Sequence, residues 1–226
     1  MKSEMSGKNE RNGERRVTRV VGLLLGGGLV AFFVLNDWSV ALIAVATLAL
    51  AFSPYLFAKR LGVQLPIPFL MLTSLFAFAS IFLGEVLNFY ERVWWWDLFL
   101  HLISGTGVGL IGFLLVFILF AGDRYAAPSY AICGMAFVFA VAIGTFWELL
   151  EYGMDQIFGT TMQKTGQDDT MSDLLMNTLG ASLGALFGYF YLLGDRFGPP
   201  SRLIQEFVRK NGHLFSRSRN RPDRET

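Results

Sequence analysis

The chain contains six apolar stretches that are each long enough to cross a bilayer as a helix: roughly residues 17–35, 38–58, 66–86, 97–120, 128–152 and 174–194. About 20 apolar residues in an α-helix span the roughly 30 Å of hydrocarbon in a bilayer. Lipid offers no hydrogen-bond partner to the backbone, which favours helices as the spanning elements. With 53% hydrophobic and only 16% charged residues, the composition also fits a lipid bilayer better than water. The sequence therefore predicts an all-α polytopic transmembrane helical bundle with six spans.

The distribution of positive charge predicts the orientation of this bundle. Lys and Arg in short loops remain on the cytoplasmic side of a membrane. Six spans place both termini on one side, and of the 19 Lys and Arg residues only Arg92 and Lys164 fall on the opposite side. We therefore expect both termini to be cytoplasmic.

The ends of the chain differ in composition from its middle. Residues 1–16 are polar and charged, which predicts a disordered cytoplasmic tail. Residues 17–196 form the predicted six-helix transmembrane domain. Residues 197–226 are basic, and Leu203 and Ile204 begin an apolar face that we expect to lie on the anionic inner leaflet before the chain becomes disordered.

Three further patterns have structural interpretations. All five Trp residues lie at outer ends of the predicted spans, where indole rings favour the membrane interface. Gly180, Gly184 and Gly188 repeat every four residues, a spacing that lets helices approach closely. The single cysteine, Cys133, lies inside the fifth span and is interpreted as a small buried apolar residue.

Acidic side chains gather at the outer ends of the predicted spans, where more than half of the 18 Asp and Glu residues face two cations. Three helices each carry a polar stripe at the same depth: Asp97 and His101 (i, i+4), Glu148 and Glu151 (i, i+3), and Asp169 and Asp173 (i, i+4). Glu85, Asp155, Asp168 and Asn177 lie nearby as supporting polar residues. We expect the three stripes to meet in one polar site.

The residue types in these stripes are compatible with several functions. Carboxylates with one imidazole suit a divalent Zn, Mn, Fe or Mg ion, which would activate water against a lipid or lipid-linked substrate. The same carboxylates could carry protons or cations in a transporter, although they stop near one interface. A non-enzymatic membrane assembly protein is the third alternative. The sequence leaves these three open, and no nucleic-acid motif or Ser/His/Asp nucleophile pattern is present.

Taken singly, the polar residues also have structural interpretations. Asp97 and Asp173 lie near helix starts, where an aspartate often caps the helix or interacts favourably with its dipole. His101 would then be a hydrogen-bonded interface residue without a metal. Glu148 and Glu151 would flank a span and meet water.

Several motifs together resemble a known family. They are Asp97-(x)3-His101, Phe146–Tyr152 (FWELLEY), Phe158-Gly159-Thr160, Asp168–Leu174 (DDTMSDL) and Gly180-Ala181. In this combination, across residues 85–192, the chain resembles the YjdF-type bacterial inner-membrane proteins and, more distantly, VanZ-like membrane proteins. The resemblance implies a multi-pass protein of the bacterial cytoplasmic (inner) membrane whose polar residues occur as a set. It implies no particular activity.

Overall fold

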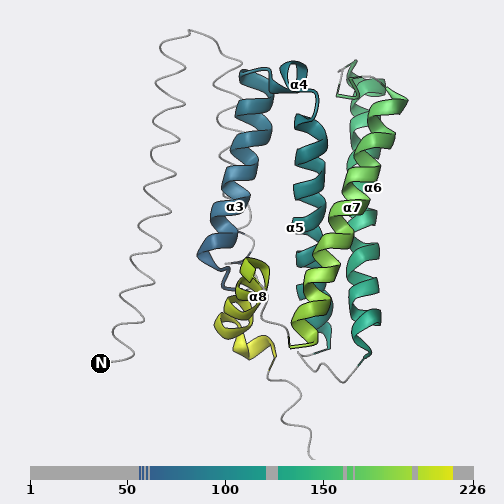
Figure 1. Ribbon diagram of the computed structural model, residues 1–226. Helices are drawn as coiled ribbons and strands as arrows, with labels where there is room; N and C mark the ends of the chain where they lie inside the picture. The colour runs from purple at the N-terminus through teal and green to yellow at the C-terminus, as the bar shows by residue number, and fades with distance from the viewer. Residues whose placement is uncertain are drawn as a thin grey trace, which may run out of the picture. The chain divides into compact units, whose positions relative to one another are not determined.

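The computed structural model describes residues 56, 58, 60, 62–120, 127–159, 162–164, 166–194 and 198–215. These residues form helices and turns, with no strand among them. The elements are α3 (Ile67–Ala77), the π-helical η1 (Phe78–Val86), α4 (Phe89–Arg92), α5 (Trp96–Leu119), α6 (Ser129–Phe158), α7 (Gln167–Leu192), α8 (Gly198–Lys210) and the 3₁₀ turn η2 (Gly212–Leu214) (Figure 1). The all-α prediction is therefore confirmed for the described part of the chain.

Several predictions lie outside the described residues. They concern the tail 1–16, the span 17–35, nearly all of the span 38–58, and the last residues after 215. The chain divides into two compact units, Met1–Val93 and Trp94–Thr226. The three helices that carry the polar stripes all belong to the second unit.

Within the first unit, α3 begins directly after Pro66 and continues into η1 without a break. Proline is tolerated there because the first residues of a helix need no intrahelical N–H bond. The last residue before α4, Asn88, has a left-handed φ of 56° and turns the chain. Glu85 is exposed near the end of η1.

In the second unit, α5 and α7 run in the same direction and α6 runs opposite to them (Figure 1). The backbones of α5 and α7 approach very closely. A Cβ atom added at Gly180 would overlap the carbonyl oxygen of Leu102, and one at Gly105 would lie 2.6 Å from the Asn177 carbonyl oxygen. The glycine pattern in α7 is thus confirmed as a helix-packing feature.

One end of this bundle is closed by apolar packing. The core there consists of Phe113, Phe117, Ile132, Cys133, Ala136, Ala185, Leu192 and Ile204. Phe113 is fully buried and stacks on Phe117, with ring centroids 5.6 Å apart. Cys133 is buried in this core, which confirms its apolar interpretation.

The helix α8 contributes to the same core, contrary to the expectation that its apolar face lies on lipid. Ile204 is 1% exposed and belongs to the core cluster, and Val208 packs against it. Arg202 and Arg209 remain exposed on the other face. The physical reason is that α5, α6 and α7 already present apolar side chains at this end, so the α8 face can be buried against protein.

Three described helical stretches are long and apolar enough to cross a membrane: Ile67–Val86, Trp96–Leu119 and Ser129–Phe158. Their starts agree closely with the predicted spans, although α6 continues beyond residue 152 to a left-handed cap at Gly159. The helix α7 is not among the three, because Asn, Ser, Thr and Gly dilute its apolar residues. It also starts at Gln167 rather than at residue 174.

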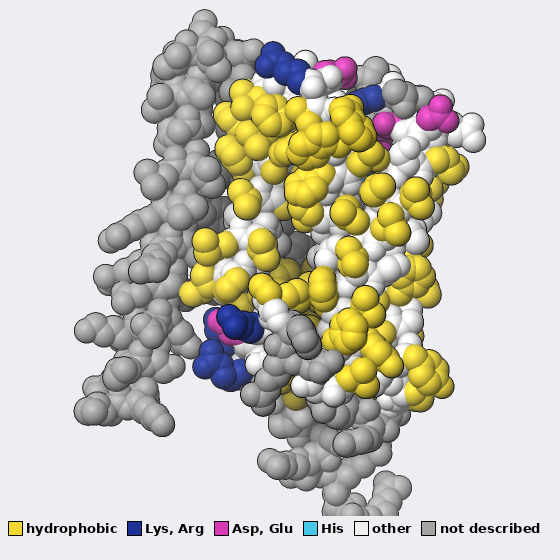
Figure 2. Space-filling view, in the orientation of Figure 1, with side chains coloured by type: hydrophobic (Ala, Val, Ile, Leu, Met, Phe, Trp, Pro, Cys, Tyr) yellow, Lys and Arg dark blue, Asp and Glu magenta, His cyan; other side chains and the backbone are white. Residues whose placement is uncertain are grey.

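The surface of the described residues suits lipid. Many large apolar side chains are exposed, among them Tyr130, Val138, Phe146 and Leu149 of α6. Figure 2 shows hydrophobic side chains over much of the face drawn. The adjacent Trp residues differ from one another: Trp94 is 83% exposed, as expected for an interface residue, whereas Trp96 is only 8% exposed and packs inward.

Candidate metal site

The polar site forms where α5 begins, α6 nears its end and α7 begins (Figure 1). The structure brings together Asp97 and His101 of α5, Glu148 of α6, and Asp173 and Asn177 of α7. Each pair on α5 and α7 is separated by one helical turn, so both members face the same neighbour.

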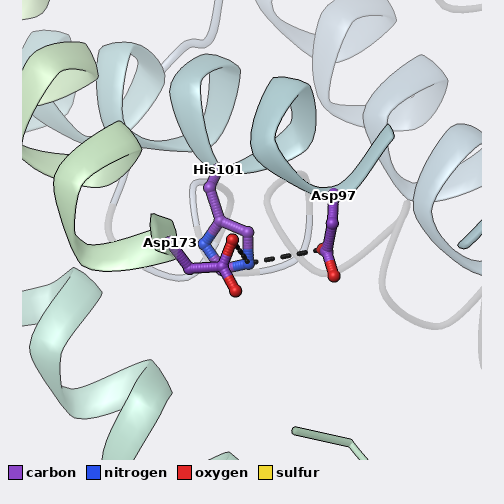
Figure 3. Close-up of side chains that lie close together, drawn as sticks. All are labelled: Asp97, His101 and Asp173. Atoms are coloured by element: carbon purple, nitrogen blue, oxygen red, sulfur yellow. Dashed lines mark ion pairs between the residues drawn. The ribbon is translucent and has the colours of Figure 1, made fainter. Parts of the chain in front are cut away.

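The ring of His101 lies at the centre of this group. Its Nε2 atom is 3.5 Å from Asp97 Oδ1 and 3.9 Å from Asp173 Oδ1. Figure 3 shows the two carboxylates directed toward the same ring nitrogen. One ligand atom from each of these three residues lies within 4.8 Å of the others, which is close enough to hold a metal ion.

The other ring nitrogen faces a different pair of side chains. His101 Nδ1 is 3.1 Å from Asn177 Nδ2 and 3.6 Å from Glu148 Oε1. Ser104, on the same helix as His101, donates its hydroxyl to Asn177 Oδ1 at 3.4 Å. Side chains from three helices therefore fix the orientation of the ring.

The group is buried, and parts of it lack hydrogen bonds. Asp173 is 2% exposed, Glu148 is 4% exposed and His101 is 8% exposed. Within the described part of the chain, Asp173 Oδ1 and both carboxylate oxygens of Glu148 accept no hydrogen bond. Removing an ion from water costs on the order of several kcal/mol when its partners are incomplete. Buried polar atoms without partners need an explanation, and binding of a cation is one.

Neither aspartate caps its helix, and only Asp97 lies where the helix dipole favours an acid. Asp173 is the seventh residue of α7, well past the Gly166 cap position. Asp97 lies in the first turn of α5, where the helix dipole favours it, but no side chain caps that helix by a hydrogen bond.

A cation approaches Asp97 from the loop between α6 and α7. Lys164 Nζ lies 2.8 Å from Asp97 Oδ2, on the carboxylate oxygen that does not face His101. From the sequence, Lys164 was expected only as a cation on the outer side. Its position as the single Lys or Arg in this loop was the signal that it would pair with one of the acids.

Two predicted site residues hold this loop instead of joining the cluster. The Asp155 carboxylate accepts hydrogen bonds from the backbone N–H groups of Met162 and Gln163, at 2.8 and 2.9 Å. Asp169 Oδ2 accepts one from the Lys164 backbone at 3.1 Å. Partial burial raises the pKa of Asp169 above its usual value, and the nearby Asp97 carboxylate adds to the rise.

The remaining predicted residues lie outside the three-residue cluster. Glu151 accepts a hydrogen bond from Trp147 Nε1 at 2.9 Å, at a partly exposed position one turn beyond Glu148. Asp168 is exposed. Glu85 belongs to the first unit of the chain.

Comparisons with known proteins agree with the membrane character of the helices. Residues 17–194 match the model of a family described as "Predicted membrane protein (DUF2238)". An uncharacterised protein of Thermotoga maritima is 31% identical over 188 residues, which cover 83% of this chain and 96% of that protein. No solved structure matches the chain. Because the family model covers most of its length, the chain belongs to the DUF2238 family of predicted membrane proteins.

Proposed function

We propose that this protein binds a divalent metal ion through Asp97, His101 and Asp173, and uses it to activate water against a lipid or lipid-linked substrate. The observation that carries the proposal is the carboxylate of Asp173. It is 2% exposed, its Oδ1 atom accepts no hydrogen bond in the described part of the chain, and it is directed toward the same point as the two α5 side chains. A divalent cation would compensate the buried charge.

The donor set favours particular ions and a catalytic role. One imidazole nitrogen with two carboxylate oxygens suits Zn²⁺, Mn²⁺ or Fe²⁺, and Mg²⁺ is less favoured because it prefers oxygen ligands. Three protein ligands leave further positions for water and substrate, as in catalytic rather than structural zinc sites. A metal-bound water would supply hydroxide near neutral pH.

The surroundings of the site support a lipid substrate. Exposed apolar residues lie next to the site on the same helices: Phe99, Trp147, Leu149 and Leu150. Such a surface suits the depth at which lipid head groups meet the hydrocarbon region. A lipid or a lipid-linked molecule would reach the site by lateral diffusion.

We further propose that the chain spans a bacterial inner membrane six times, with the site at the outer face and both termini in the cytoplasm. The distribution of Lys and Arg supports this orientation, as does the resemblance to YjdF-type proteins. Single cysteines introduced by Asp168→Cys or Arg202→Cys, in a Cys133→Ser background, would test it with a membrane-impermeant maleimide. Asp168→Cys should react in spheroplasts with an intact inner membrane, and Arg202→Cys only after lysis. The reverse pattern would contradict the orientation.

Transport of cations or protons is less well supported by the geometry. Below the site, α5 and α7 are in backbone contact at Gly105, Gly109 and Gly184. Past this contact comes the apolar core around Phe113. A path for ions needs polar groups at the middle of the membrane, and the acids of these helices lie at one end.

Elemental analysis of the full chain, purified in metal-free detergent buffer, tests the proposal. We expect close to one divalent transition-metal ion per chain in the wild type, and a loss of it in His101→Ala and Asp173→Ala. Asp168→Ala is the matched control, because Asp168 is an exposed acid on the same helix as Asp173. A folded wild type that takes up no ion, even after incubation with excess Mn²⁺, Zn²⁺ or Co²⁺, would contradict the proposal.

The catalytic half of the proposal needs a separate measurement. Mass spectrometry of lipids from proteoliposomes made with a bacterial lipid extract should show a product that forms with the wild type and not with His101→Ala or in EDTA. An ion flux that depends on Asp173, without a lipid product, would favour transport instead. If neither a lipid product nor an ion flux is found, the assembly role is the remaining candidate.

A further inference from the structure

Glu148 is the group that the three-residue metal cluster leaves unexplained. It comes from α6, whereas the cluster comes from α5 and α7. It is 4% exposed, and neither of its carboxylate oxygens accepts a hydrogen bond within the described residues. It forms an ion pair with His101, whose Nδ1 atom lies 3.6 Å from Glu148 Oε1. A buried carboxylate without hydrogen bonds destabilises the fold unless a nearby group compensates its charge, and the His101 ring is the partner within reach.

The ring nitrogen that Glu148 faces is not the nitrogen that faces the metal cluster. Nε2 is directed at Asp97 and Asp173, and Nδ1 is directed at Glu148 and Asn177. An imidazole that binds a metal through Nε2 must carry its proton on Nδ1. Metal-binding histidines usually donate this second N–H to a carboxylate or a carbonyl oxygen, which fixes the tautomer and makes the ligand more basic.

The amide of Asn177 is compatible with that tautomer after a half-turn. As described, Asn177 Nδ2 faces His101 Nδ1, and Ser104 donates its hydroxyl to Oδ1. Turning the amide by about 180° places Oδ1 beside Nδ1 and Nδ2 beside the Ser104 oxygen, which has lone pairs to accept a hydrogen bond. A Cβ atom at Gly144 would lie 3.0 Å from the amide, so glycine there leaves room for the side chain.

We propose that Glu148 is a positioning residue that accepts the Nδ1–H of His101 and thereby presents Nε2 to the metal ion, with Asn177 assisting through its amide oxygen. This inference rests on the metal site proposed above and adds which residues bind the ion and which residue positions a ligand. Asp97, His101 and Asp173 are the ligands, and Glu148 is not a ligand. The metal then keeps open positions for water and substrate, and the carboxylate-backed imidazole favours transition metals over Mg²⁺.

Co²⁺ is the probe for the test, because its visible absorption reports the ligands around it. The full chain in detergent is titrated with Co²⁺ as wild type, Glu148→Gln and Glu151→Gln. Glu151 is the matched control, since it lies one turn further along α6 and is bonded to Trp147. We expect Glu148→Gln to bind Co²⁺ about 10- to 100-fold more weakly, with the same stoichiometry and the same spectrum at saturation. Glu151→Gln should change the affinity by less than about threefold, because Glu151 does not contact the His101 ring.

The outcomes separate this inference from the metal site itself. A changed spectrum in saturated Glu148→Gln would make Glu148 a ligand, and an unchanged affinity would remove it from the site. Either result overturns the inference while the metal site stands. A wild type that does not bind Co²⁺ overturns both.

A second measurement does not depend on a Glu148 variant folding. The chain has two His residues, so His213→Gln leaves His101 as the only one. In this background with ¹⁵N-labelled histidine and Zn²⁺, nuclear magnetic resonance should show the ring proton on Nδ1 and the metal on Nε2. The opposite assignment would contradict the inference.

Discussion

The two ends of the α5–α6–α7 bundle are packed with different kinds of side chains. At one end Phe113, Phe117 and Ile132 close the interface as an apolar core. At the other end the same three helices meet around His101 and Asp173, with buried oxygen atoms that accept no hydrogen bond among the described residues. The core end shows that these helices can be joined by apolar packing alone.

The polar end is not explained by packing alone. Replacing buried ionic groups with apolar side chains of similar volume is often neutral or stabilising. A sequence under pressure for packing alone would therefore repeat the Phe and Ile pattern at both ends. The buried carboxylates at the polar end are better explained by a ligand than by stability.

Truncation at the apolar end should have the largest effect on stability and little effect on metal binding. Phe113→Ala removes a ring that is fully buried and stacked on Phe117, and comparable truncations cost about 3–5 kcal/mol. Thermal unfolding in detergent measures the loss, and Phe146→Ala is the control because that ring is 68% exposed. A large loss of Co²⁺ affinity in folded Phe113→Ala would show that the two ends are not separable.

An added methyl group between α5 and α7 should lower both the stability of the bundle and its affinity for Co²⁺. The Cβ atom of Gly180→Ala would overlap the Leu102 carbonyl oxygen, and overpacking of this kind costs about 1–3 kcal/mol. The helices must separate, which moves Asp173 away from His101 and weakens Co²⁺ binding. Gly107→Ala is the matched control, since its Cβ would meet nothing within 4 Å. Equal effects of the two substitutions would show that the close approach is unimportant.

The smallest expected effect concerns the loop cation. Lys164→Met removes a positive charge that lies 2.8 Å from Asp97 Oδ2. The substitution should raise Co²⁺ affinity about threefold to tenfold, or roughly 0.7–1.4 kcal/mol, because the ammonium repels the ion and competes for the carboxylate. Lys210→Met is the control, as Lys210 is paired with Glu206 on α8. A loss of affinity in Lys164→Met would instead mean that this loop holds Asp97 in place.

Periodicity and charge predicted much of this architecture. The apolar runs gave the starts of α5 and α6 to within one or two residues, because a change from polar to apolar residues is local information. The start of α7 was missed by several residues, since Asp168 and Asp169 are polar yet belong to its first turn. The burial of Ile204 was also missed, because an amphipathic face does not reveal whether lipid or protein covers it.

The spacing of the site residues predicted which side chains share a helix face, and the structure adds how those faces meet. Asp97 and His101 were expected together, as were Glu148 and Glu151. Sequence could not separate the buried Glu148 from the partly exposed Glu151, since they differ only in their angle around α6. It also could not show that Asp155 and Asp169 bind the loop backbone, because such contacts depend on the path of residues 162–164.

The most direct test of the ligand-based explanation is the stability of Asp173→Asn relative to wild type, with and without metal. Without metal, in EDTA, the variant should be more stable, because the amide removes a buried charge whose Oδ1 atom accepts no hydrogen bond among the described residues. A gain of 1 kcal/mol corresponds to a rise in Tm of about 2–4 °C for a chain of this size.

With Co²⁺ at 100 times the wild-type Kd, the order should reverse. Binding at that concentration stabilises the wild type by about 2.7 kcal/mol, whereas Asp173→Asn has lost a ligand and gains much less. A crossing of the two stabilities is the result that a ligand-dependent site predicts. A variant that is less stable than wild type in EDTA, with no difference in its response to Co²⁺, would show that Asp173 serves the fold and not a metal.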